Sequence, residues 1–278
     1  MAKVLLLLRH TVREFQEDDC THMAAGVAYY AMFSIFPLLL GLVAVLGMLL
    51  DADALQAQLA DAVSAVLPGT GDLVTSTVRG VVAARGSMGI VAVAGLFWSA
   101  SAIFAAIRRS VNLAWDVPRS RPFLKQKAID LAMTLGTGLL FVLSFGTTAA
   151  YRALSELEIP LLALGTVGAS PLWQPVGFVL PLLFTFAIFA SVYRFLPNTR
   201  VAWGDVWPGA LVGSVAFEVA KYGFVLYLEH FATYNLVYGP LTSVIAFLFW
   251  AYISALVLLF GAELSSEYAR LYGSHARG

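Results

Sequence analysis

Two residues of opposite charge lie within an otherwise apolar stretch of the chain, residues 206–229. Glu218 and Lys221 are three positions apart, so on a helix they lie on one face and can form an ion pair. Ser214 and Tyr222 extend that face. An ionisable group in an apolar helix is costly unless it is paired or hydrated, so the pair has one of two roles. It locks neighbouring helices together, or it lines a polar cavity that contacts a substrate or coupling ions.

A longer polar stripe runs along residues 128–151. Its members are spaced so that they fall on one face of a helix. They are Asp130, Thr134, Thr137, Ser144 and Thr148. Hydroxyl groups of this kind commonly join transmembrane helices through hydrogen bonds. The alternative is a water-lined pathway, in which Asp130 helps to carry protons.

A third polar face combines Ser101, Arg108 and Asn112 near the end of the stretch 87–111. Arg108 either extends to the lipid headgroups of the nearer leaflet or binds an anionic headgroup inside a cleft. The candidate substrate-binding residues are therefore Arg108, Asn112, Glu218, Lys221 and Tyr222.

Proline and glycine mark positions where helices can bend or approach closely, because proline removes a backbone hydrogen bond and glycine has no side chain. The candidate hinges are Pro37, Gly41, Pro181 and Gly209. Kinked helices around buried polar groups suit a transporter, although static bundles contain them too.

The residues that commonly build catalytic or metal centres are sparse in this chain. The single cysteine, Cys20, cannot form an internal disulfide or a thiolate metal site. The 4 histidines are not spaced to hold zinc on one helix face. The chain contains no Walker-type phosphate-binding sequence. We therefore expect no enzyme activity, no metal and no cofactor.

The composition places these polar residues in a membrane. Of the 278 residues 60% are apolar and 12% are charged, which is more apolar surface than a water-soluble core can bury. Spanning a bilayer takes about 20 apolar helical residues. Stretches that meet this length are predicted at 24–50, 87–111, 128–151, 174–196, 206–229 and 240–264. The predicted fold class is an all-α integral membrane protein with about six transmembrane helices.

The charges are balanced overall but unevenly distributed. A net charge of 0 argues against nucleic acid as a partner, so we expect membrane lipids, anionic ones included, as partners. Most of the 17 lysines and arginines border one set of alternate loops and both chain ends. Because cytoplasmic loops retain positive charge, both termini are predicted to be cytoplasmic. The oligomeric state stays open, with a homodimer among the alternatives.

Two less hydrophobic segments flank the first predicted span. Residues 1–23 are predicted to form an interfacial amphipathic helix. Residues 52–85 are predicted to form an amphipathic helical hairpin on the outer side, either a fixed cap or a mobile lid. The membrane domain would cover residues 24–266, hairpin included, and residues 267–278 would be a cytoplasmic tail.

Short segments along nearly the whole chain match a known pattern. They are Ala24–Tyr30, Ser34–Pro37, Phe97–Ser101 with Asn112, Leu196–Arg200, Trp207–Ala210, Tyr238–Gly239 and Gly261–Leu264. In these segments the chain resembles the YihY/BrkB family, which has also carried the label ribonuclease BN. The resemblance implies a multi-pass protein of the bacterial inner membrane. Family members have been linked to serum resistance, and one branch to export of a lipopolysaccharide precursor.

The resemblance and the polar faces together predict an inner-membrane transporter that moves a lipid or another anionic amphiphile across or within the membrane. The alternatives are a structural or regulatory protein that supports envelope integrity, and a small-solute or ion carrier. We do not expect a ribonuclease, because the soluble acidic cluster, Glu14, Glu17, Asp18 and Asp19, has no converging base or metal ligands.

Overall fold

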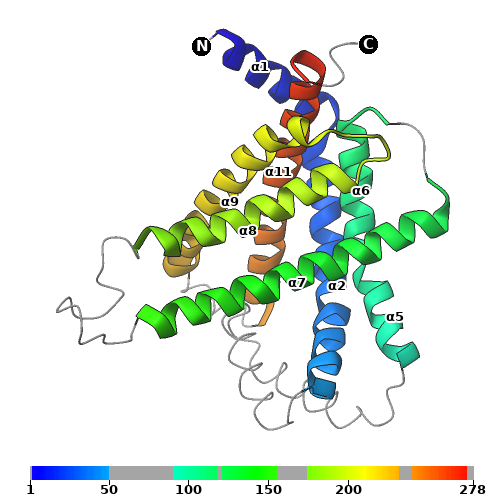
Figure 1. The fold of residues 1–278 in the computed structure, drawn as a ribbon, viewed down its shortest axis with the longest axis vertical. Coiled ribbons are helices and arrows are strands. Elements are labelled where there is room, and N and C mark those ends of the chain that lie inside the picture. The colour runs from blue at the N-terminus through cyan, green and yellow to red at the C-terminus, as the bar shows by residue number, and fades with distance from the viewer. Residues whose placement is uncertain (1, 50–89, 118–120, 156–173, 232–239, 274–278) are drawn as a thin grey trace.

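The computed structural model describes residues 2–49, 90–117, 121–155, 174–231 and 240–273, and none of these residues forms a strand. The helices are α1 (Ala2–Glu17), α2 (Cys20–Leu49), α5 (Ile90–Ala100), α6 (Ala102–Ala114), α7 (Phe123–Ser155), α8 (Gln174–Phe195), α9 (Trp203–Phe231) and α11 (Pro240–Leu271) (Figure 1). Each predicted apolar stretch corresponds to a helix or a pair of helices, as expected where a chain must satisfy its own backbone groups in lipid. The predicted outer hairpin, residues 52–85, lies outside the described residues.

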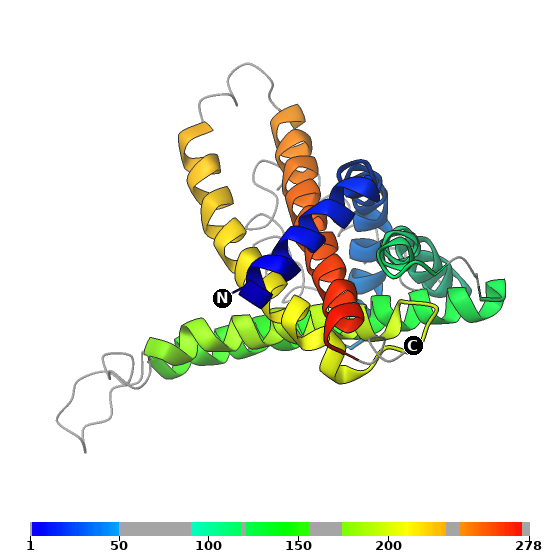
Figure 2. The same cartoon turned by 90° about the horizontal axis from the view of Figure 1, so that it is seen from above.

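Helix α11 is the centre of the bundle. It packs against α9, α2, α1, α6 and α8. Seen from above, α9 lies along one side of α11 and α1 crosses its last turns (Figure 2). Helices α7 and α8 contact each other and run obliquely across one side of the upright helices α2, α6 and α11 (Figure 1). The start of α1 and the end of α11 lie close together, and the hydroxyl of Tyr272 donates to the carbonyl oxygen of Lys3.

Helices α9 and α11 approach each other through glycine. A side chain on Gly209 would collide with the backbone oxygen of Gly261 and with the side chain of Ser265. A side chain on Gly261 would in turn collide with the hydroxyl of the fully buried Tyr193, which donates to the carbonyl oxygen of Leu258 at 2.7 Å. Gly209 is thus a close-packing position of the kind small residues provide between membrane helices.

The other candidate hinges lie inside long helices. Pro37 is within α2 and Pro181 within α8, where each removes a backbone donor from the helix. Gly41 also falls within α2. That these positions move in a functional cycle stays a prediction.

The second predicted span is broken at Ser101, which separates α5 from α6. The Ser101 hydroxyl donates to the carbonyl oxygen of Trp98 at 2.7 Å, and back-bonding of this kind bends helices. The ammonium of Lys127, from α7, donates to the same carbonyl at 2.8 Å and to the Ser101 hydroxyl at 2.6 Å. The break is therefore stabilised by a cation from the neighbouring helix.

Two aspartates with a left-handed backbone form the turn between α1 and α2 and the turn after α6. Asp19 has φ 53° and turns the chain between α1 and α2, so the predicted interfacial segment 1–23 is interrupted. Asp116 has φ 48° and follows α6. The amide of Asp116 donates to Leu113 and that of Val117 to Asn112, which satisfies the last carbonyls of α6.

Length and hydropathy identify two of the described helices as able to cross a membrane, Trp203–Leu228 and Val244–Leu271. Residues Val179–Phe195 form a shorter apolar helix. Helix α11 continues past the predicted end of its span at residue 264, because Ser265, Ser266 and Glu267 are buried against neighbouring helices.

Candidate functional site

The ion pair predicted on α9 is present. Lys221 Nζ lies 2.7 Å from Glu218 Oε2. The other carboxylate oxygen, Oε1, accepts a hydrogen bond of 3.0 Å from the hydroxyl of Thr185 on α8. Glu218 therefore joins α8 to α9 and holds Lys221 at the same time.

The two charges of this pair differ in exposure. The Lys221 side chain is 38% exposed, whereas that of Glu218 is 9% exposed. The Lys221 ammonium also lies 5.7 Å from the ring centroid of Phe217, which packs in turn on Trp250 of α11. The carboxylate is thus buried between helices, while the ammonium lies at the open edge of the pair.

The other two residues of the predicted polar face, Ser214 and Tyr222, differ in exposure. Ser214 is fully buried, and its hydroxyl donates to the carbonyl oxygen of Leu211 at 2.9 Å. Tyr222 is 63% exposed. Tyr222 therefore does not enclose the pair but borders its open side.

A second buried ion pair joins α6 to α7. Arg108 Nε and Nη2 donate to the two carboxylate oxygens of Asp130 at 2.8 and 3.0 Å. Asp130 is 1% exposed and Arg108 is 8% exposed. Arg108 and Asp130 were predicted to have separate roles, but the structure pairs them with each other. Two nitrogens of the guanidinium thus donate to the same carboxylate.

Asn112 extends this second pair toward the segment between α8 and α9. Its side-chain oxygen accepts a 2.7 Å hydrogen bond from the amide of Asn198. Close by, Arg121 Nη2 donates to the carbonyl oxygen of Pro197 at 2.5 Å. Burial, together with the nearby Arg108 charge, lowers the pKa of Arg121. Asn112 is thus hydrogen-bonded to the backbone between α8 and α9. That it binds a substrate stays a prediction.

The polar stripe of α7 is only partly accounted for by contacts between helices. Thr134 is buried, but its hydroxyl donates to the carbonyl oxygen of Asp130 in the same helix at 2.8 Å. Thr137 is half-buried. The side chains of Ser144 and Thr148 lie outside the described residues. A water-lined path along α7 stays a prediction.

Reasoning from the sequence missed, among other contacts, those made by Thr185 and Glu263. Thr185 contacts Glu218 from a different helix, so no spacing rule could have identified it. Glu263, 1% exposed in α11, accepts a 3.4 Å hydrogen bond from the Cys20 thiol. Glu263 lies inside the predicted span 240–264, so the rule that singles out ionisable residues in apolar helices would have found it.

The chemistry available at these positions is ion pairing. A partly exposed ammonium with a displaceable carboxylate can bind an anion. Among the described residues no group of three or more histidine, cysteine, aspartate or glutamate side chains is placed to hold a metal ion. The α9 pair, together with Thr185, is therefore the candidate site, and we call it the α9 anion site.

Known proteins similar to this chain are membrane proteins. A UPF0761 membrane protein of Photobacterium profundum is 26% identical over 269 residues, which cover 96% of this chain and 82% of that protein. A UPF0761 membrane protein of Chromohalobacter salexigens is 30% identical over 270 residues, covering 95% of this chain and 63% of the longer relative. No solved structure matches the chain. The model of the family described as virulence factor BrkB matches residues 11–277, so the chain belongs to that family of proteins.

Proposed function

We propose that this protein moves an anionic amphiphile, such as a lipid, across or within the bacterial inner membrane, with both of its termini in the cytoplasm. The proposal is supported chiefly by the α9 anion site, in which the lysine side chain is partly exposed and that of the glutamate is buried. A cation in an apolar helix is costly to keep, and such residues commonly mark a substrate pathway.

In this mechanism the anionic headgroup replaces Glu218 as the partner of Lys221. Glu218 keeps the hydrogen bond from Thr185 when the lysine turns away, but a neutral hydroxyl does not replace the positive charge of the ammonium. The exchange therefore costs part of the attraction between Glu218 and Lys221. The new charge-assisted hydrogen bond from Lys221 to the headgroup offsets that cost, which allows both binding and release.

The surface beside Lys221 suits the apolar part of such a substrate. Val225, one helical turn after Lys221, is exposed, as are Tyr222 and Leu226. The acyl chains can therefore remain in the lipid along α9 while the headgroup contacts Lys221. No enclosed channel wide enough for the chains is then required.

The second ion pair favours a structural role. Arg108 and Asp130 are both buried and bound to each other through two hydrogen bonds. We therefore place Arg108 and Asn112 in the scaffold that holds α6, α7 and the segment after α8, and Lys221 in the path of the substrate. The proposed role is therefore structural for the pair of Arg108 and Asp130, and substrate binding for the pair of Glu218 and Lys221.

The test measures lipid movement in proteoliposomes. Vesicles of phosphatidylcholine would carry a trace of fluorescent phosphatidylglycerol or fluorescent phosphatidylcholine, and dithionite would report the rate at which the label changes leaflet. We expect the protein to move phosphatidylglycerol faster. The neutral replacement Glu218→Gln with Lys221→Gln should slow phosphatidylglycerol about tenfold, as expected for loss of a charge-assisted hydrogen bond.

The matched control is Arg109→Gln, because Arg109 is exposed on α6 and lies outside both ion pairs. Lys221→Arg should keep most of the movement, since it preserves the charge. The proposal fails if the neutral replacement elutes as a folded protein in size-exclusion chromatography and still moves phosphatidylglycerol as fast as the unaltered protein. It also fails if the unaltered protein moves neither lipid.

A further inference from the structure

Helix α1 presents three chemically different faces. One face packs on the bundle, with Thr11 fully buried and the ring of Phe15 set edge-on 5.9 Å from that of Phe260 in α11. The second face is apolar and exposed, and consists of Val4, Leu5, Leu8 and Val12. The third face carries Leu6, Arg9, His10 and Arg13, which are spaced to share one side of a helix.

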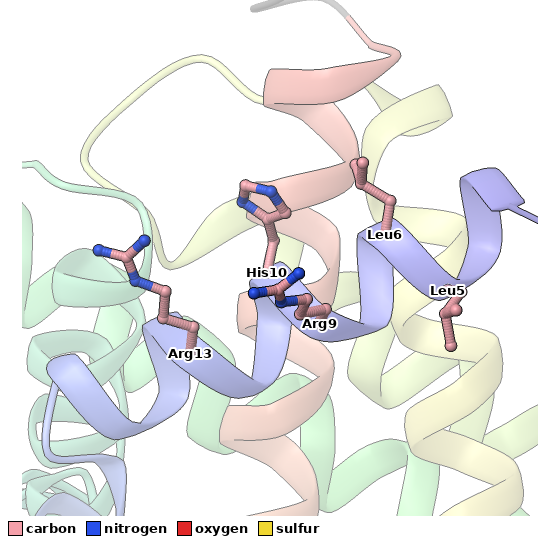
Figure 3. Close-up of a pocket in the computed structure, with 5 residues that line it drawn as sticks. All are labelled: Leu5, Leu6, Arg9, His10 and Arg13. Atoms are coloured by element: carbon pink, nitrogen blue, oxygen red, sulfur yellow. The ribbon is translucent and has the colours of Figure 1, made fainter.

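A cavity of about 510 Å³ lies along this third face. The described residues that line it are Leu5, Leu6, Arg9, His10 and Arg13. Figure 3 shows Leu6, His10 and the two arginines on the same side of α1, in front of the end of α11, with Leu5 directed away from them. The cavity thus combines three basic side chains with a largely apolar lining, and it borders the exposed apolar face.

The basic groups of this cavity retain free hydrogen-bond donors. Arg9 makes no hydrogen bond or ion pair with the residues that the structure describes. Arg13 uses only Nε, which lies 2.7 Å from Glu17 Oε1 in an exposed pair, and such pairs are weak. His10 Nδ1 lies 3.7 Å from Glu267 Oε2, which fixes one edge of the imidazole on α11. Two guanidinium groups therefore remain available to an incoming anion.

We infer that Arg9, His10 and Arg13 form a binding site for the phosphate group of an anionic lipid in the adjacent leaflet. An amphipathic helix lying in the membrane interface places its apolar face among acyl chains and its flanking cations at the level of the phosphates. Guanidinium groups match phosphate oxygens in geometry and charge.

The apolar face decides between a lipid and free phosphate. A dissolved anion would make no favourable contact with the exposed apolar face of α1. A lipid whose headgroup lies at Arg9 and Arg13 would place its acyl chains against that face. The site is separate from the α9 anion site and does not depend on transport by it. It would anchor α1 to the membrane surface.

The test follows thermal unfolding of the full chain in a neutral detergent. The protein would be titrated with dihexanoyl phosphatidylglycerol, with dihexanoyl phosphatidylcholine, and with inorganic phosphate. A ligand that binds the folded state raises Tm. We expect phosphatidylglycerol to raise Tm most. Arg9→Gln should weaken that binding about fivefold, and Arg9→Gln with Arg13→Gln about thirtyfold, from the usual contribution of one basic residue at an anionic surface.

Matched variants separate the outcomes. Arg109→Gln removes an exposed arginine from α6 and should leave the phosphatidylglycerol titration unchanged. Leu5→Ser with Leu8→Ser should weaken phosphatidylglycerol while the arginines remain. An equal Tm shift from inorganic phosphate alone overturns the lipid assignment, and an unchanged titration in Arg9→Gln overturns the site. Lipid movement through Lys221 is measured separately, so either proposal can fail without the other.

Discussion

At the scale of single residues, the pair of Arg108 and Asp130 makes the sharpest stability prediction. Asp130→Asn leaves the guanidinium of Arg108 buried without its counter-charge, and breaking a buried pair costs about 3–5 kcal/mol. We expect a large fall in the Tm of the detergent-solubilised protein. Replacing both residues, Arg108→Met with Asp130→Leu, should recover most of the loss because no unpaired charge remains.

The same measurement decides what Arg108 does. If Asp130→Asn leaves Tm unchanged, the guanidinium does not need Asp130, and the earlier alternative that Arg108 binds a headgroup is favoured. A double-mutant cycle with the two single replacements gives the coupling between them. Arg109→Gln serves as the control, since the exposed Arg109 should show little change.

The two ion pairs also show which contacts a sequence can predict. Glu218 and Lys221 share one helix, so a spacing of three positions was enough to predict their contact. Arg108 and Asp130 belong to different helices, and their contact depends on how α6 crosses α7. No pattern within one segment contains that information. The contact of Thr185 with Glu218 is missing from the sequence for the same reason.

At the scale of helices, glycine on α9 allows a matched experiment. Gly209→Ala places a methyl group against the backbone of Gly261 and against Ser265, so α9 must move away from α11. Overpacking of this kind costs about 1–3 kcal/mol. Gly223→Ala, on the same helix, meets no atom within 4 Å and should be neutral or stabilising by up to about 1 kcal/mol. Unfolding of both variants in detergent measures the difference.

The result expected at Gly209 depends on packing and not on helix propensity, because both replacements exchange glycine for alanine in one helix. Equal Tm values for the two variants would contradict the close approach of α9 and α11. Retained lipid movement in Gly209→Ala would argue that the position is not a hinge. A loss of movement without a loss of stability would argue that it is.

Helix positions were predictable because lipid imposes a minimum apolar length, whereas the breaks between helices were not. The division at Ser101 depends on Lys127, which arrives from α7 and binds the Trp98 carbonyl. The turn at Asp19 requires a left-handed backbone that aspartate tolerates without demanding it. Both features follow from contacts or conformations that hydropathy does not encode.

At the scale of the whole molecule, segments distant in the sequence meet around the end of α11. Arg270 near the end of α11 pairs with Glu267 at 2.9 Å, with Asp116 after α6, and lies 4.0 Å from Glu14 of α1. Acidic groups outnumber basic ones here. The junction therefore holds α1, α6 and α11 together while carrying unrelieved repulsion between carboxylates.

Burial and this repulsion act together on Asp18. Burial, followed by the negative charges of Asp116 and Glu14, raises the pKa of Asp18 above 3.8, while contacts with Glu263 and Arg270 oppose the rise. A carboxyl with a raised pKa binds its proton more tightly in the folded state, so stability falls as pH rises from 3.8 through that raised value. Above that raised pKa the full penalty is present.

We therefore expect Asp18→Asn to raise Tm at neutral pH. The difference in Tm between the variant and the unaltered protein should shrink as pH falls through the same window, because protonation of Asp18 also removes its charge. Taking the difference cancels the titration of carboxyls that do not interact with Asp18. Asp53→Asn, a replacement elsewhere in the sequence, controls for the change in net charge. If the difference is zero at neutral pH or grows on acidification, Asp18 does not carry the repulsion, and the junction is held by a balanced set of charges.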